Sequence, residues 1–142
     1  MNRILVTGSR HLVEFAPSPD RVEDHWHLVA RGLERHGPGL VVHGDAQGCD
    51  RMAAAYAVRA GWPTPEPHPA DWSRGKVGGR ERNQLMVDLG ADVCLAFPRR
   101  GSIGTFDCLV RARRAGIPCR IVLSDMTEAE AMECAVRAER RL

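Results

Sequence analysis

The segment 78–107 contains the residue types and the spacing that most clearly indicate a functional site. An apolar run at 91–98 is followed at once by a glycine-rich segment at 99–105, and residues 106–115 have helical spacing. A strand that ends in such a turn at a helix N-terminus presents free backbone N–H groups and the positive end of the helix dipole. The pattern predicts a site for a phosphate or another anion. It therefore favours nucleotides and phosphorylated sugars as ligands.

Arg82 and Asp107 are the residues of this run that could act on a ligand. Arg82 shares a helix face with Met86, and a charged side chain on an inward face needs a partner or a ligand. It either holds a phosphate or carboxylate at the rim of a cleft, or it forms a structural ion pair with Asp107 or Asp92. Asp107 either complements the dipole of the helix whose first turn it occupies, or contacts ribose hydroxyls or a developing oxocarbenium ion. For both residues the two interpretations stay open.

Two further glycine-containing turns follow predicted strands, at residues 8–10 and 44–48. The carboxyl ends of parallel strands meet at one edge of a sheet, so all three loops are expected to converge on one ligand site. Asp50 either caps the helix that follows or contacts the ligand, and His43 is interpreted as a buried core residue. The candidate ligand-binding residues are Gly8, Ser9, Arg10, Gly44, Asp45, Gly48, Asp50, Arg82, Asn83, Gly101, Ser102, Gly104 and Thr105.

Five basic side chains are expected around this cleft, where they either form a solvated basic loop or contact a phosphate: Arg74, Lys76, Arg80, Arg99 and Arg100. Trp72 could stack on a base or simply pack its loop. The chain has no HExxH motif and no Cys/His cluster, so we expect neither a metal nor another cofactor. It also has no P-loop, no GxGxxG after the first strand and no GxSxG elbow.

The elements that must position these residues alternate along the chain. Apolar runs predict strands at 3–7, 40–43, 64–68, 92–97 and 119–123, with the proline-broken third strand at an edge. Helical spacing predicts helices at 20–36, 49–60, 79–89, 105–115 and 127–142, the last with a capping box from Thr127 and Glu130. This alternation predicts one α/β domain over residues 1–142, a Rossmann-like three-layer fold with a mainly parallel, five-stranded, doubly wound sheet.

Composition narrows the class further. The 142 residues carry a net charge of +2 and 5% aromatic residues, which argues against general nucleic-acid binding. The 5 cysteines form no CxxC pair and lie in predicted helices or strands, so we expect small buried hydrophobes in a reducing compartment. No run is long enough to span a membrane or to form a signal-peptide core. The expected location is the cytoplasm.

Four segments together resemble a known family: RILVTGSR, VVHGDAQGCDRMAA, PADWSRGKVGGRERNQLM and GADVCLAFPRRGSIGTFD. They are similar to the YspA-like, cpYpsA-related branch of the SLOG superfamily, which also contains the Smf/DprA proteins and the Lonely-guy (LOG) phosphoribohydrolases. The resemblance spans residues 3–123. It implies a Rossmann-like domain that binds a nucleotide or a nucleotide-derived ligand.

The LOG enzymes carry an Arg-Lys pair on a helix and a PGGxGTxxE loop, which Arg82-Asn83 and residues 101–107 resemble. The resemblance implies that Arg82 orients the ligand, that residues 101–105 hold phosphate, and that Asp107 takes the place of the catalytic Glu. Three residues depart from the LOG pattern: Asn83 replaces Lys, Ser102 replaces the second Gly, and Asp107 is one methylene shorter than Glu.

The resemblance favours a sensor or carrier for a ligand such as ADP-ribose or a nucleoside monophosphate. The alternative is a hydrolase that cleaves the N-glycosidic bond of a nucleoside 5′-monophosphate to free base and ribose 5-phosphate, with Arg82 and Asp107 as its catalytic residues. Binding of single-stranded DNA, as in the DprA relatives, is a third and less favoured function. Because the LOG relatives pair through helices, a homodimer is also expected.

Overall fold

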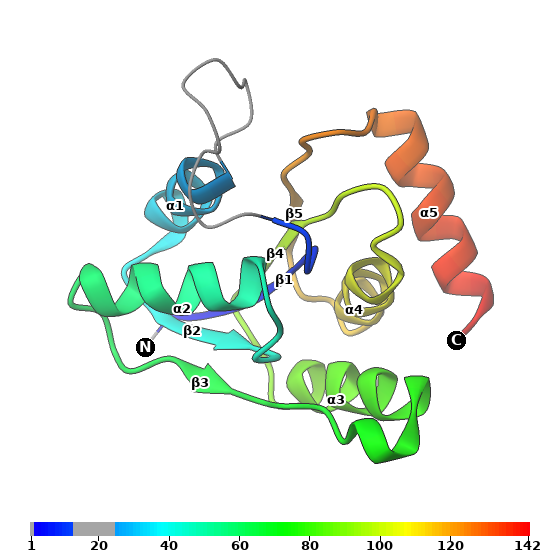
Figure 1. Ribbon diagram of the computed structural model, residues 1–142, viewed down its shortest axis with the longest axis horizontal. Helices are drawn as coiled ribbons and strands as arrows, with labels where there is room; N and C mark the ends of the chain where they lie inside the picture. The colour runs from blue at the N-terminus through cyan, green and yellow to red at the C-terminus, as the bar shows by residue number, and fades with distance from the viewer. Residues whose placement is uncertain (1, 13–24) are drawn as a thin grey trace.

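The computed structural model describes residues 2–12 and 25–142, and its centre is one parallel β-sheet (Figure 1). The strand order is β3-β2-β1-β4-β5. Every neighbouring pair runs parallel. The strands are β1 Arg3–Gly8, β2 Leu40–His43, β3 Glu66–Pro67, β4 Val93–Phe97 and β5 Cys119–Ile121. The α-helices are α1 His25–His36, α2 Cys49–Arg59, α3 Lys76–Asp88, α4 Ile103–Arg114 and α5 Glu128–Arg140, and a 3-10 helix, η1, spans Trp72–Arg74.

Successive side chains of the central strand β1 point alternately to the two faces of the sheet, so the hydrophobic core is divided between these two faces. Ile4 and Val6 of β1 pack in one apolar cluster with residues of α1 and α2. Leu5, between them, packs in a second cluster with residues of α3 and α4. Successive side chains of a strand point to opposite faces, so both faces of the sheet are covered by helices (Figure 1). α5 lies outside α4 and packs on it through Ala131, Ala135 and Ala138.

The chain changes direction across the sheet at β1. It runs from β1 outward through β2 to β3, and then returns to place β4 on the other side of β1. At such a switch point the loops that leave the two central strands diverge to opposite faces and open a crevice at their carboxyl ends. The turn after Gly8 and the segment after Phe97 therefore border the same crevice, and Ser9 N–H donates to the Phe97 carbonyl at 3.0 Å.

The predicted α/β, doubly wound, Rossmann-like class is confirmed, and the sheet is entirely parallel. The edge position of the third strand is also confirmed, as is the capping box of Thr127 and Glu130. β3 and β5 are shorter than the predicted 64–68 and 119–123. Of the helix predicted at 20–36, residues 20–24 lie outside the described residues.

Two helix boundaries were wrong in a way that matters for the site. α3 begins at Lys76, three residues before the predicted start at residue 79, and η1 forms immediately before it. Gly78 and Gly79 are buried inside α3. A Cβ at Gly78 would collide with the backbone of Asp71, and a Cβ at Gly79 would press on Trp72 of η1. These glycines serve close packing and do not break the helix. α4 begins at Ile103, two residues before the predicted start.

The cysteines follow the predicted pattern in part. Cys49, Cys94 and Cys108 are free and buried, whereas Cys119 and Cys134 are only partly buried. Burial raises the pKa of Cys49 and, to about 12, that of Cys108. These thiols therefore behave as small apolar side chains. In the described ranges, no helix has the length and apolarity needed to cross a bilayer.

Candidate functional site

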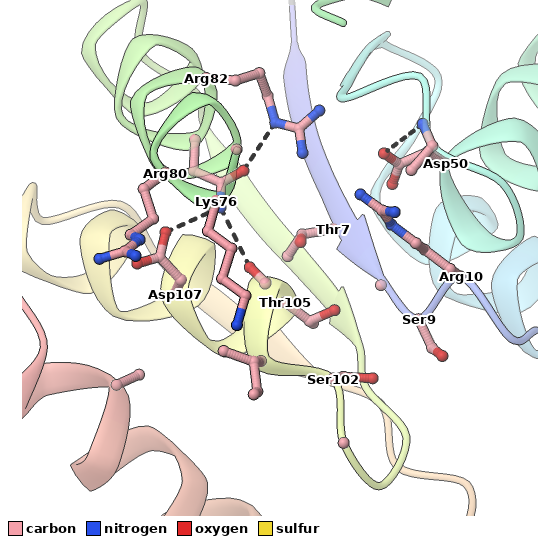
Figure 2. A pocket seen from close by; sticks show the side chains of 18 of the residues that line it. Thr7, Ser9, Arg10, Asp50, Lys76, Arg80, Arg82, Ser102, Thr105 and Asp107 are labelled. Atoms are coloured by element: carbon pink, nitrogen blue, oxygen red, sulfur yellow. Dashed lines mark hydrogen bonds between the residues drawn. The ribbon is translucent and has the colours of Figure 1, made fainter. Parts of the chain in front are cut away.

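A cleft of about 520 Å³ opens at the carboxyl ends of β1 and β4 (Figure 2). Its walls come from the turn after β1, the loop before α2, η1 with α3, the start of α4 and the end of α5. Segments far apart in the sequence therefore meet at the switch point. The basic side chains that line the cleft are Arg10, Lys76, Arg80, Arg82 and Arg141.

The start of α4 presents backbone N–H groups to the cleft. Ser102 is the N-cap residue, but its hydroxyl accepts from the Arg99 N–H at 2.9 Å and makes no cap bond to the helix. The first N–H groups of a helix have no intrahelical partner, and in the described part of the chain Gly104 and Thr105 gain none from elsewhere. Figure 2 shows Lys76 extending from α3 into the cleft, toward this helix start. Together these groups can hold an anion.

The loop before α4 is held in place by contacts to the segment that precedes α5. The Arg100 N–H donates to Asp125 at 3.1 Å, and the Arg100 guanidinium pairs with Glu130 at 2.9 Å. Arg99 pairs with Asp125 at 3.5 Å. Neither arginine lines the cleft, and Arg74, which pairs with Glu81, does not line it either. Of the basic cluster predicted around the site, Lys76 and Arg80 are the members that line it.

Asp107 belongs to a network that joins α3 to α4. Its two carboxylate oxygens accept from Arg111 at 2.9 and 3.2 Å, and one of them also accepts from the Asn83 side-chain amide at 2.9 Å. Because α4 begins at Ile103, Asp107 lies in the second turn. Its interpretation as a first-turn residue that complements the helix dipole is therefore wrong. Asp107 lines the cleft, but it is only 6% exposed and ion-paired.

Among the residues that the structure describes, Arg82 forms no ion pair with Asp107 or Asp92, the two partners that were predicted for a structural role, and it binds backbone carbonyls instead. Its guanidinium donates to the Gly44 carbonyl at 2.6 Å and the His68 carbonyl at 3.3 Å, and its Nε donates to Asn83 at 3.0 Å. Asp107 is paired with Arg111 instead. Arg82 thus connects α3 to the chain that follows β2 and β3, and it still lines the cleft.

Asp92, the other partner considered for Arg82, lies at the amino end of β4. There its carboxylate accepts from the Arg3 backbone N–H at 2.7 Å. The cleft lies at the carboxyl end of the same sheet, so Asp92 is a structural residue at the opposite edge.

The turn after β1 packs tightly on the N-terminus of α2. The Ser9 carbonyl accepts from Cys49 N–H at 3.1 Å, and the Ser9 hydroxyl accepts from His11 N–H at 3.0 Å. Gly48 has a φ of 76°, and a Cβ there would lie 2.5 Å from the Ser9 oxygen. Gly48 therefore supports the site by close approach of two backbones and does not itself line the cleft.

Asp50 is buried in the wall of the cleft at 5% exposure. One carboxylate oxygen accepts from the N–H groups of Gly44 at 3.0 Å and Ala46 at 3.2 Å. Burial raises the pKa of Asp50 from 3.8 to about 6, although these N–H groups and the guanidinium groups of Arg82 and Arg10 act in the opposite direction. Asp50 thus orders the loop after β2, and its charge changes near neutral pH.

His43, the last residue of β2, and Asp45 in the loop that follows do not line the cleft. His43 is buried, as predicted, and its Nδ1 accepts from the Asp45 N–H at 3.0 Å. Burial lowers the pKa of His43, which keeps the ring neutral. Asp45 is exposed and has a φ of 55°.

We expect Asp50 to make stability depend on pH. Because its folded pKa is raised from 3.8 to about 6, the folded chain binds more protons than the unfolded chain in this range, and stability falls as pH rises from about 4 to 7. The loss should amount to about 3 kcal/mol. Urea unfolding across this range should show it in the native chain and not in Asp50→Asn, whose amide oxygen can keep both N–H bonds. A difference between the two proteins that stays constant with pH would contradict the assignment.

The structure brings most of the predicted site residues to this one cleft and leaves others out. Those that line it are Gly8, Ser9, Arg10, Asp50, Arg82, Asn83, Gly101, Ser102, Gly104, Thr105 and Asp107. Gly44, Asp45 and Gly48 shape the neighbouring loop instead. The residues that also line the cleft but were not predicted are Val6, Thr7, His11, Ala46, Gly79, Met86, Ile103, Ala138 and Arg141. Arg141 could not have been found from sequence, because nothing local indicates that the end of α5 reaches the site.

The described cleft carries more basic than acidic side chains. Within residues 2–12 and 25–142, no three His, Cys, Asp or Glu side chains gather as metal ligands would. The acidic residues that line the cleft are engaged, Asp50 by backbone N–H groups and Asp107 by Arg111. Arg82 is engaged as well, by the Gly44 and His68 carbonyls. The N–H groups at the start of α4 and the Lys76 side chain that extends toward them can meet a negatively charged ligand.

This fold and this cleft define a Rossmann-like α/β protein with its site at the switch point of the sheet. The sequence profile of the YspA, cpYpsA-related SLOG family matches residues 2–75. Among curated proteins, the "Gene 61 protein" of Mycobacterium phage D29 is 44% identical over 123 residues, which covers 83% of this chain and 94% of that protein. The chain belongs to the YspA, cpYpsA-related SLOG family. No solved structure matches the chain significantly.

Proposed function

We propose that the cleft binds a phosphorylated, nucleotide-derived ligand, such as a nucleoside monophosphate or ADP-ribose, and that the protein serves as a sensor or carrier. The observation that carries the proposal is the start of α4. The unpartnered N–H groups of Gly104 and Thr105 face a cleft whose charged side chains are mostly basic. A phosphate suits this combination of a helix N-terminus and cationic side chains. Membership of the SLOG family supports a nucleotide-related ligand.

The contacts of Asp107 favour binding over hydrolysis. Cleavage of an N-glycosidic bond needs a carboxylate that faces the sugar and changes its role as positive charge develops there. Both oxygens of Asp107 accept from Arg111, and Asn83, at the LOG lysine position, donates to the same carboxylate. A carboxylate held in this way stabilises the packing of α3 on α4. We therefore propose binding without turnover.

A thermal-shift screen tests the proposal with nucleoside monophosphates, ADP-ribose, NAD and cyclic nucleotides, and chromatography of the same samples detects free base. A ligand at about 100 times its Kd should raise the Tm by about 10 °C for a domain of this size. Lys76→Ala should weaken binding about tenfold through loss of one phosphate contact. Arg74→Ala is the matched control, because Arg74 is a nearby basic residue that pairs with Glu81 and does not line the cleft.

Three results would contradict the proposal in different ways. If no nucleotide raises the Tm, the cleft is not a nucleotide site. If Lys76→Ala and Arg74→Ala weaken binding equally, the ligand does not lie at the start of α4. If a bound monophosphate releases its base, the protein is a hydrolase and not a sensor or carrier.

A further inference from the structure

Trp72 exposes an aromatic surface at the wall of the cleft. It opens η1, it is 50% exposed, and it lines the cleft beside Lys76 and Gly79. An aromatic side chain contributes a large, flat apolar surface to binding sites, so a half-exposed indole beside a cleft can receive a flat ligand group. A nucleobase is such a group, because every base has a flat face that stacks on an aromatic ring.

The indole is held in position by the chain around it. Asp71 caps η1, with its carboxylate accepting from the Ser73 N–H at 3.1 Å and from the Ser73 hydroxyl. α3 carries Gly79 where the ring lies, and a Cβ at Gly79 would come within 3.0 Å of the indole. Two glycines inside a helix weaken it. Here they let η1 approach α3, so that Trp72 is fixed at the cleft before any ligand binds.

Arg10 covers this ring from the opposite wall. Its guanidinium lies 4.6 Å from the centre of a Trp72 ring. Figure 2 shows Arg10 entering the cleft from the turn after β1, on the side of Asp50. An exposed cation–π contact is weak compared with the stacking of a base on an aromatic side chain. A base can therefore displace the guanidinium from the indole, and the displaced arginine can then pair with a phosphate.

We propose that Trp72 is the base-stacking surface of the cleft, and that Arg10 moves from the indole to the phosphate when the ligand binds. This inference rests on the proposed function and specifies it. The ligand carries an aromatic base that lies on η1 and a phosphate that lies at the start of α4. A phosphorylated sugar without a base would use only the second half of the site.

Calorimetric titrations with adenosine 5′-monophosphate and ribose 5-phosphate test this proposal, because the two probes share the phosphorylated ribose and differ in the base. The native chain should bind the nucleotide about tenfold more tightly. Trp72→Ala should remove this preference without weakening the binding of ribose 5-phosphate, because the substitution also frees Arg10 to reach the phosphate. Trp72→Phe keeps an aromatic face and should keep part of the preference, which guards against a general effect of the substitution on folding.

The exchange of Arg10 has its own readout. Arg10→Gln should weaken binding of adenosine 5′-monophosphate more than binding of ribose 5-phosphate, because only a base displaces the guanidinium from the indole toward the phosphate. The preference for the nucleotide should therefore fall. Tryptophan fluorescence should change when the nucleotide binds to the native chain, and this change should be absent in Trp72→Phe. Trp26 and Trp62 remain as internal references, since both pack against the apolar cluster beneath α1 and α2.

The outcomes separate this inference from the proposed function. If both probes bind equally well, or if the preference survives in Trp72→Ala, the base does not lie on Trp72, although the phosphate site stands. If Arg10→Gln leaves the preference unchanged, the exchange of Arg10 is wrong. If neither probe binds, both the proposed function and the base-stacking surface are overturned.

Discussion

Asp107→Asn should lower the free energy of unfolding by about 3 kcal/mol, as is typical when one partner of a largely buried ion pair is removed. The side chains of Arg111 and Asp107 are only 17% and 9% exposed. An amide at position 107 would leave the Arg111 guanidinium without its counter-charge and would offer N–H donors where Asn83 also donates. Urea unfolding followed by circular dichroism measures the loss.

Glu139→Gln is the matched control for this prediction. Glu139 of α5 pairs with Arg114 of α4 at 3.1 Å, but the two side chains are 40% and 60% exposed. An exposed pair contributes less than about 1 kcal/mol. A double-mutant cycle of Asp107→Asn with Arg111→Gln should show strong coupling. If Asp107→Asn is as mild as Glu139→Gln, the carboxylate has no structural role, and the hydrolytic alternative gains support.

Gly48→Ala should cost about 3 kcal/mol or more, because backbone strain and overpacking act at the same residue. Gly48 has a φ of 76° and a ψ of −123°, and the added methyl group would lie 2.5 Å from the Ser9 carbonyl oxygen and 2.7 Å from that of Arg10. The substitution therefore separates the turn after β1 from α2. Ligand affinity should fall as well, since Ser9 and Arg10 line the cleft.

Gly116→Ala is the control that separates the cost of backbone strain at positive φ from the cost of the steric overlap at residue 48. Gly116 has a similar φ of 79°, but a Cβ there meets nothing within 4 Å. We expect it to cost about 1 kcal/mol, the lower part of the range for a residue held at positive φ. Urea unfolding of the two variants side by side gives the comparison. Equal losses would mean that the contact between residues 9 and 48 contributes nothing to stability.

Local patterns predicted most of the fold. Apolar runs located β1, β2 and β4, because a strand that is covered on both faces is apolar along its whole length. The capping box of Thr127 and Glu130 was readable because both of its bonds lie within one turn. The glycine-rich loop at the start of α4 was equally local. Convergence of the loops on one cleft followed from the general geometry of doubly wound sheets.

The boundary of α3 was wrong because local propensity and tertiary packing disagree there. Gly78 and Gly79 disfavour a helix by themselves, and the sequence therefore predicted a loop up to this point. In the folded chain both glycines are buried against the segment 71–74, which compensates for their low propensity. Trp72 and Lys76 were predicted near the cleft, but their orientation in it depends on where η1 ends and α3 begins.

The order of strands and helices, the glycine-rich turns and the residue types available to a ligand follow from local patterns, because they depend on neighbours within a few residues. Which groups are engaged depends instead on how the folded chain packs. Asp107 is bound by Asn83 and Arg111, Arg82 by two carbonyls, and Arg10 by Trp72. Most of these partners lie far apart in the chain. The packing of helices on the sheet selects among several chemically equivalent partners, and spacing in the sequence does not encode that choice.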